Sequence, residues 1–142
     1  MINSNCKPVS LLLVEDDDID AMGVERAIHA MKLLNPIFRA RDGLEALERL
    51  RGGEIPSPYI VLLDLNMPRM NGLEFLSEVR NDETLCSMVI FVLTTSKRDE
   101  EVLAAYKKNV AGYIVKSAMS QGFNQVLSLL DNYWRIVELP EQ

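Results

Sequence analysis

One apolar run that stops at a carboxylate restricts the folds open to this chain. Residues 60–63 read Ile-Val-Leu-Leu, and Asp64 follows directly. A run this short is either a strand buried on both faces or a piece of buried helix. The β-branched residues at its start and Pro68 after it favour the strand. Asp64 then lies where the strand leaves the sheet, either capping the next turn or serving a ligand, because ligands of open parallel sheets bind outside the carboxyl ends of the strands.

Four further segments have the short apolar pattern of strands, and the segments between them have helical spacing. The strand segments are residues 11–14, 37–40, 88–93 and 112–115. The predicted inner-face residues of the first three helices are Ala21, Val24, Ile28 and Met31, then Leu44, Leu47 and Leu50, then Phe75, Leu76 and Val79. Two more helices are predicted over residues 97–109 and 119–137.

Polar residues mark where these helices begin. Asp17 or Asp18 is placed to cap the first helix, Asp42-Gly43 turns the chain before the second, and Asn71-Gly72 opens the third. Strands that alternate with helices along a chain build a parallel sheet with helices on both faces. We therefore predict an α/β fold with a doubly wound, five-stranded parallel sheet in a single domain.

The composition restricts the number of domains, the binding partners and the cellular location that we expect. The chain has 142 residues, of which 48% are hydrophobic and 25% charged, which suits one globular domain. A net charge of −6 disfavours direct binding of nucleic acid phosphates. No apolar stretch reaches the ~18 residues of a membrane span, so we expect no membrane insertion. Cys6 and Cys86 form no disulfide framework, which indicates a reducing, cytoplasmic location.

The predicted strands end in an unusual set of polar side chains. Glu15 and Asp16 follow the first strand, Asp64 the third, Thr94 the fourth and Lys116 the fifth. The carboxyl ends of parallel strands share one edge of the sheet. In the strand order 2-1-3-4-5 the first and third strands are neighbours, so their acids converge.

Three converging acids repel one another and need a cation. Oxygen ligands without a nearby cysteine or histidine favour Mg²⁺. Glu15, Asp16 and Asp64 fit such a site, and a backbone carbonyl at Asn66 could complete it. The single histidine, His29, falls on the first helix with no other ligand near it, and we expect it at the surface.

An aspartate beside Mg²⁺, an amine and a hydroxyl forms a site that can accept a phosphoryl group. Asp64 would be the nucleophile and would become an aspartyl phosphate. The metal and Lys116 would neutralise charge on the transferred group. Thr94 could then hydrogen-bond a phosphoryl oxygen, which makes it a candidate switch.

These residues resemble the receiver domain of bacterial two-component response regulators, over roughly residues 8–137, with tails at 1–7 and 138–142. The matching pieces are Leu13-Val14-Glu15-Asp16-Asp17, then Leu62 to Pro68 with Gly72, then Leu93-Thr94-Thr95, then Gly112-Tyr113-Ile114-Val115-Lys116. The resemblance implies a flavodoxin-like fold of strand order 2-1-3-4-5. It also implies that Asp64 takes a phosphoryl group from a histidine kinase.

The resemblance assigns further roles at the same edge. Glu15, Asp16, Asp64 and the Asn66 carbonyl would hold Mg²⁺. Thr94, Tyr113 and Lys116 would be the switch residues, with Tyr113 moving inward as Thr94 engages phosphate. The chain departs from the family at Ser117, where a proline, often preceded by a cis peptide bond, usually follows the lysine. A cis bond before serine costs about 3 kcal/mol, so that geometry cannot be carried over.

A narrower likeness rests on the long first predicted helix and on the C-terminal part of the chain. Lys116-Ser117 and the ending Tyr133-Trp134 to Pro140 are similar to single-domain regulators paired with bacterial and cyanobacterial phytochromes. The last predicted helix also carries a second apolar stripe of Leu129, Tyr133 and Ile136. We interpret this stripe as a homodimer surface. The alternative is that it packs under the chain's own tail at Leu139-Pro140.

Three other functions can be tested against the same residues. An aspartate-nucleophile phosphatase usually has an acid two residues after the nucleophile, where this chain has Asn66, which cannot act as a general acid. A carrier of a flavin phosphate needs a phosphate-binding loop after the first strand, where this chain has four acids. A degenerate receiver would lack acceptor residues that are present here. We expect a signalling switch rather than an enzyme that turns over a substrate.

Overall fold

The computed structural model describes residues 9–30, 35–65, 67, 69–94 and 110–116. The predicted helices over 97–109 and 119–137 lie outside these residues, together with Leu129, Tyr133 and Ile136 of the expected dimer surface. The expected tails, residues 1–7 and 138–142, lie outside them as well.

The described strands form the predicted parallel sheet. They are β1 (Ser10–Val14), β2 (Ile37–Ala40), β3 (Tyr59–Asp64), β4 (Val89–Thr94) and β5 (Gly112–Val115). Every neighbouring pair is parallel, and the order is β2-β1-β3-β4-β5, which confirms the doubly wound architecture. The strand order reverses between β1 and β3, so the edge beyond these two strands is where such sheets bind ligands.

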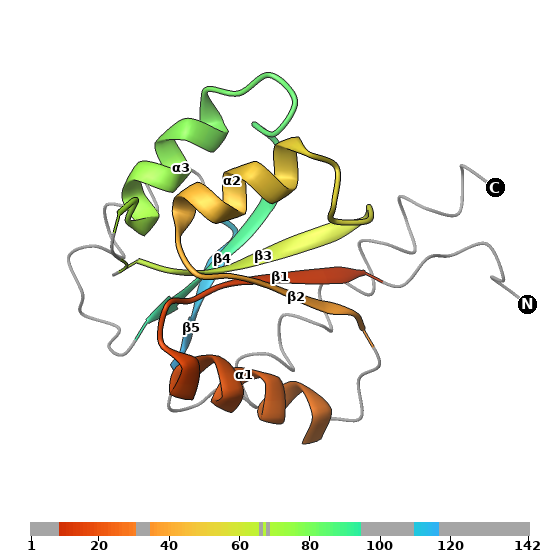
Figure 1. Ribbon diagram of the computed structural model, residues 1–142, viewed down its shortest axis with the longest axis vertical. Helices are drawn as coiled ribbons and strands as arrows, with labels where there is room; N and C mark the ends of the chain where they lie inside the picture. The colour runs from red at the N-terminus through yellow and green to blue at the C-terminus, as the bar shows by residue number, and fades with distance from the viewer. Residues whose placement is uncertain (1–8, 31–34, 66, 68, 95–109, 117–142) are drawn as a thin grey trace, which may run out of the picture.

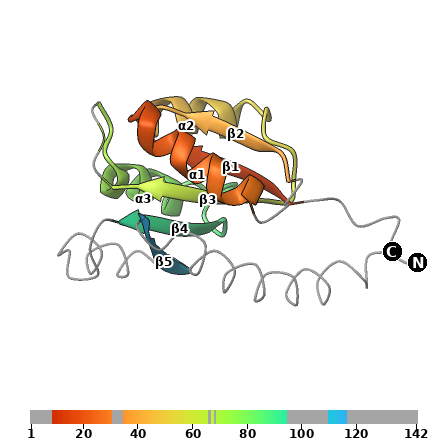
Figure 2. The same cartoon turned by 90° about the horizontal axis from the view of Figure 1, so that it is seen from below.

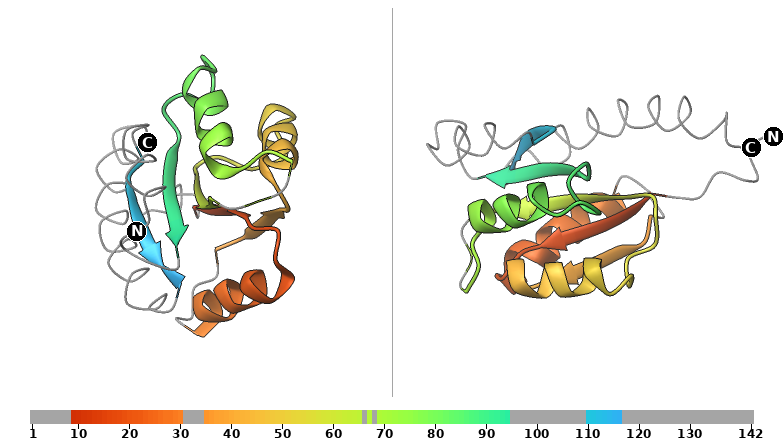
Figure 3. Two further views of the ribbon diagram at one scale, coloured as in Figure 1. Left: turned by 90° about the vertical axis from the view of Figure 1, so that its left-hand side faces the viewer. Right: turned by 90° about the horizontal axis from the view of Figure 1, so that it is seen from above.

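Three helices are described, and they cover both faces of the sheet. Helix α1 (Asp18–Ala30) lies on one face, and α2 (Gly43–Arg51) and α3 (Gly72–Arg80) lie on the other (Figure 1). The turned views show the same division, with α1 across the sheet from α2 and α3 (Figures 2 and 3).

The apolar runs of the central strands are buried on both faces because successive side chains of a strand point in opposite directions. In β1, Leu11 and Leu13 pack toward α1, whereas Leu12 and Val14 pack toward α2 and α3. The core on the α1 side is completed by Ala21, Val24, Ile28, Ile60, Leu62, Phe91, Leu93 and Ile114. A continuous apolar strand is therefore the pattern that a sheet covered on both sides requires.

Each described helix starts at a side chain that accepts backbone N–H groups. Asp17 Oδ1 accepts from Ile19 at 2.8 Å, which identifies Asp17 as the cap of α1. Asp42 Oδ1 accepts from Glu45 at 2.9 Å at the start of α2. Asn71 caps α3 in a reciprocal arrangement. The first N–H groups of a helix lack partners within it, so these acceptors stabilise the starts that the sequence predicted.

One predicted inner-face residue is wrong. Leu44 was expected to face the sheet, but 40% of it is exposed. Helix α2 begins at Gly43, and the side facing the core is formed by Gly43, Ala46, Leu47 and Leu50. That spacing of three and four residues follows the helical repeat. Position 44 lies about 100° around the helix axis from the buried side.

Glycine at position 72 lets α3 begin directly against the end of β3. The Gly72 N–H donates to the Leu65 carbonyl at 2.9 Å. A Cβ atom at position 72 would lie 2.7 Å from Leu65 Cα and 2.9 Å from the Asp64 carbonyl oxygen. Both neighbours are backbone atoms of the segment that carries Asp64, so the contact helps to fix where that segment leaves the sheet.

Two glycine-to-alanine substitutions should have opposite effects on stability. Gly72→Ala should lower the free energy of unfolding by about 1–3 kcal/mol, because the added methyl group overlaps backbone that has little room to move. Gly23→Ala should raise it by about 0.5–1 kcal/mol, because position 23 is an open site inside α1. Urea unfolding of both variants tests this pair. A Gly72→Ala protein as stable as the wild type would contradict the close contact.

Candidate functional site

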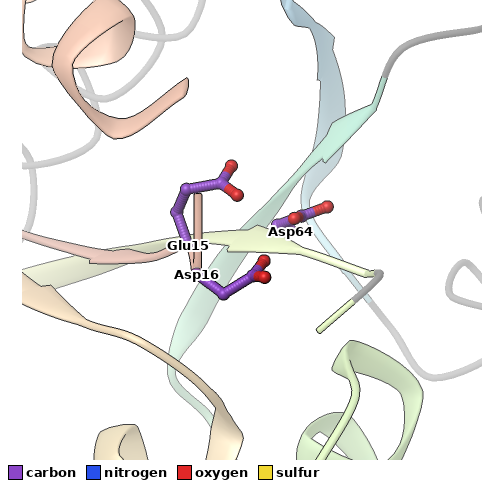
Figure 4. Close-up of side chains that lie close together, drawn as sticks. All are labelled: Glu15, Asp16 and Asp64. Atoms are coloured by element: carbon purple, nitrogen blue, oxygen red, sulfur yellow. The ribbon is translucent and has the colours of Figure 1, made fainter. Parts of the chain in front are cut away.

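The strand register places three carboxylates together at the carboxyl edge of the sheet. Val14 pairs with Leu63, so the next residues, Glu15 and Asp64, leave neighbouring strands side by side. Asp16 follows in the turn after β1. Figure 4 shows the three side chains close together, with Asp64 on β3 and Glu15 and Asp16 at the end of β1. One carboxylate oxygen from each residue lies within 4.8 Å of the other two.

Lys116, at the end of β5, balances part of this negative charge. Its Nζ lies 2.8 Å from Glu15 Oε1, 2.8 Å from Asp20 Oδ2 and 3.8 Å from Asp64 Oδ2. Burial of the side chain, which is 17% exposed, disfavours the ammonium. The hydrogen bond that the ammonium donates to Asp20 and its ion pair with Glu15 outweigh that burial and raise the pKa of Lys116 above its ordinary value. Lys116 is therefore a permanent cation at this edge.

Glu15 is the most buried member of the acidic group, with 1% of its surface exposed. Burial is the largest cause that raises the pKa of Glu15, to about 7, and the neighbouring Asp64 carboxyl adds to it, whereas Lys116 opposes it. A buried carboxyl beside two further acids has an unfavourable charge that a cation would relieve. The donor set contains only oxygen atoms, and it fits a hard divalent cation.

The turn that carries Glu15 and Asp16 is held by an arginine that the sequence pattern did not single out. Arg39 Nε and Nη2 donate to the Glu15 backbone carbonyl at 3.1 and 2.9 Å. Arg39 Nη1 also donates to Asp18 Oδ1 at 2.7 Å, and Arg41 Nη1 donates to the same oxygen at 2.9 Å. These arginines keep the pKa of Asp18 below its ordinary value, Arg39 most strongly. The β1–α1 turn is thus tied to the next strand.

The segment after Asp64 is tied to the start of α2. Arg69 Nε donates to Asp42 Oδ2 at 2.6 Å, and the Gly43 N–H donates to the Met70 carbonyl at 3.1 Å. Asp42 is buried, which disfavours its charge, but the Arg69 guanidinium and the Glu45 N–H hold its pKa below the ordinary value. Arg69 has a φ of 61°, a conformation uncommon for a residue with a side chain. Arg69 and Met70, in the segment after Asp64, are thus held against the start of α2.

The remaining residues expected at the site are placed to different extents. Thr94 ends β4 beside Val115 in the register, and its side chain lies outside the described residues. Tyr113 is partly buried against the core on the α2 and α3 side. Asn66 and the Lys116–Ser117 peptide fall outside the described residues. His29 is exposed on α1, as the sequence indicated.

Asp20 is the site residue that sequence reasoning missed. It lies in the first turn of α1, and its carboxylate accepts a hydrogen bond from Lys116, which is 96 positions away along the chain. The acidic run after the first strand was visible in the sequence. Which of those acids meets the fifth strand depends on the packing of α1 against the sheet, and no local pattern reports that.

The chain is similar to known proteins in both sequence and structure. The family described as response regulator receiver domain matches residues 11–128. The chain is 35% identical to the probable methanogenesis regulatory protein FilR2 of Methanothrix harundinacea, over 89% of this chain and 84% of that protein. It is 32% identical to the response regulator Rcp1 of Synechocystis, over 99% of both proteins.

Solved structures with similar folds agree with the sequence relatives. The bacteriophytochrome response regulator RtBRR has a TM-score of 0.75 and 34% identity, covering 86% of this chain and 77% of that one. The phosphorylated cyanobacterial phytochrome response regulator RcpA has a TM-score of 0.72 and 32% identity, covering 90% and 94%. The Mn²⁺-bound form of Rcp1 has a TM-score of 0.70 and 29% identity, covering 80% and 91%. With its sheet order, its acidic edge and these matches, the chain belongs to the family of response regulator receiver domains and resembles those paired with phytochromes.

Proposed function

We propose that this receiver acts as a single-domain response regulator in which Asp64 accepts a phosphoryl group from a histidine kinase. The observation that carries the proposal is the convergence of Glu15, Asp16 and Asp64 within 4.8 Å, with the Lys116 ammonium 3.8 Å from Asp64. An acid held between other acids and one fixed cation suits acceptance of a group whose negative charge must be neutralised.

In the proposed transfer a carboxylate oxygen of Asp64 attacks the phosphorus of a phosphohistidine. The bond between phosphorus and the histidine nitrogen breaks, and its electron pair stays on the imidazole, which takes up a proton. Mg²⁺, held by Glu15, Asp16, Asp64 and the Asn66 carbonyl, would neutralise charge on the phosphoryl oxygens. Rcp1, a relative of this chain, has been solved in a Mn²⁺-bound form, which supports a divalent cation in this family.

After transfer, Lys116 and Thr94 would bind the new phosphoryl group. The ammonium of Lys116 is fixed at the correct edge of the sheet, and Thr94 ends the neighbouring strand. Tyr113 would move further inward as Thr94 turns toward phosphate. The product is a changed surface rather than a released molecule, so we class the protein as a switch and not as a turnover enzyme.

The partner and location of this switch follow from its relatives and composition. RtBRR is described as a bacteriophytochrome response regulator, and RcpA as a cyanobacterial phytochrome response regulator. We propose a phytochrome-type histidine kinase as the phosphoryl donor and the cytoplasm as the location. Among the helices that the structure describes, none has the length and apolar character needed to cross a membrane. The net charge of −6 supports a protein partner rather than nucleic acid.

Phosphorylation should depend on Asp64. Acetyl phosphate with Mg²⁺ should add one phosphoryl group to the wild-type protein, and Asp64→Asn should add none, because the amide is not a nucleophile. Intact mass measures the product. Asp82→Asn is a matched control, because Asp82 lies near Tyr59 at the opposite end of β3 and asparagine can still accept the Thr84 N–H. Unchanged labelling of Asp64→Asn would remove the proposed acceptor.

Mg²⁺ affinity should rise with pH and level off above about pH 7. Below that value Glu15 binds a proton in the metal-free protein because its pKa is raised to about 7, so a cation must displace the proton. Calorimetric titration with Mg²⁺ at pH 6, 7 and 8, in buffers of different ionisation enthalpy, measures both affinity and proton release. Glu15→Gln should flatten the dependence. A wild-type affinity that is constant over this range, with no proton released, would contradict the role of Glu15.

We also propose that the protein forms a homodimer through Leu129, Tyr133 and Ile136. Tyr133→Asp should shift the protein toward monomer, because it places a charge in an apolar stripe. Sedimentation velocity over a concentration series, with and without phosphorylation, measures the shift. Ser128→Asp adds the same charge on the polar side of the predicted helix and should leave the dimer intact. A wild-type monomer under all these conditions would overturn the interface.

A further inference from the structure

Lys116 is shared among three carboxylates, and the phosphoacceptor is the most distant of them. Its Nζ lies 2.8 Å from both Glu15 Oε1 and Asp20 Oδ2, but 3.8 Å from Asp64 Oδ2. The contact with Asp20 is a direct hydrogen bond from the ammonium. In this conformation the lysine is therefore bound more closely to the first turn of α1 than to the residue that it would serve.

The two close partners differ in how readily they can release the lysine. Glu15 is 1% exposed, so a carboxylate left there without the ammonium would be a buried, uncompensated charge. The Asp20 side chain is 41% exposed, so water can replace the ammonium around it. A hollow lined by Ile19, Asp20, Gly23, Val24 and Lys116 opens beside the pair. Solvent therefore has access to the Asp20 contact.

A phosphoryl group on Asp64 would need the same ammonium. It brings a second negative charge to the position toward which Lys116 must move, and the Asp20 hydrogen bond opposes that movement. We propose that Asp20 is a positioning residue that retains Lys116 in the unphosphorylated receiver, so that its carboxylate competes with the phosphoryl group for the ammonium. The inference rests on the proposed acceptance of phosphate at Asp64, and it makes α1 a determinant of how readily the receiver enters its phosphorylated state.

Beryllofluoride with Mg²⁺, a stable analogue of the phosphoryl group, tests the competition. Asp20→Asn keeps the shape of the side chain and removes its charge, and it should tighten beryllofluoride binding about two- to fivefold, the range expected for a partly exposed ion pair. Asp20→Ser should give the same direction of change, because it also removes the carboxylate. Asp20→Glu restores a carboxylate and should return the affinity toward that of the wild type.

The matched control is Asp17→Asn, which removes the same charge from the same helix start. Asp17 caps α1 through its Oδ1, a role that asparagine also fills, and Lys116 donates to Asp20 instead. Its effect on beryllofluoride affinity should be clearly smaller. An equal gain for Asp17→Asn would show that net charge alone is responsible, and would overturn the proposal.

Thermal unfolding separates competition from a purely structural role. Without metal or beryllofluoride, Asp20→Asn should lower the melting temperature slightly, because a hydrogen bond and an ion pair are lost. The same variant should bind beryllofluoride more tightly, whereas a structural role would weaken both. Unchanged or weaker binding by Asp20→Asn would mean that Asp20 orients Lys116 for the phosphoryl group, against the proposal. Beryllofluoride binding that survives in Asp64→Asn would refute the acceptor assignment itself, whatever Asp20 does.

Discussion

Repulsion between acids at the ends of two neighbouring strands is the constraint to which the rest of this structure responds. Glu15 and Asp64 are brought together by the backbone pairing of β1 with β3. Packing of the core fixes that pairing, even though the two carboxylates repel each other. Lys116 follows β5, which is separated from β3 by β4, and its ammonium offsets part of this repulsion. The high pKa of Glu15 shows that the compensation is incomplete, because burial still disfavours its charge. An incompletely compensated group of acids is well suited to respond to a cation and to a transferred phosphoryl group.

The segments that carry these acids are fixed by contacts outside the group itself. Arg39 binds the backbone carbonyl of Glu15, and Asp42 binds Arg69 in the loop that follows Asp64. Gly72 lets the start of α3 lie against the same loop. Each contact comes from an element next to the site in space, so the loops carry the chemistry while β2, α2 and α3 hold them.

Much of the fold could be predicted because local pattern and global architecture agree. Unbroken apolar runs such as 60–63 predict strands buried on both faces, and the structure buries them on both faces. The acids at strand ends could be predicted to meet, since parallel strands share an edge. Leu44 was misplaced because a repeat of three residues (44, 47, 50) drifts by about 60° per step around a helix, whereas the buried side follows Gly43, Ala46, Leu47 and Leu50. Arg39 and Asp20 could not be found, since their partners depend on packing between distant segments. The dimer stripe stays a prediction.

The pairing of Val14 with Leu63 has a consequence for how such a site can change. The apolar residues that fix the register of β1 and β3 also set the distance between the carboxylates at the ends of these strands. Slipping β1 by a single position along β3 would exchange its two buried faces, moving Leu11 and Leu13 out of the core beside α1 and Leu12 and Val14 into it. Substitutions in the surrounding loops can therefore alter the site gradually. The spacing of the acids is harder to change, because a change of register would misplace every core side chain of the strand.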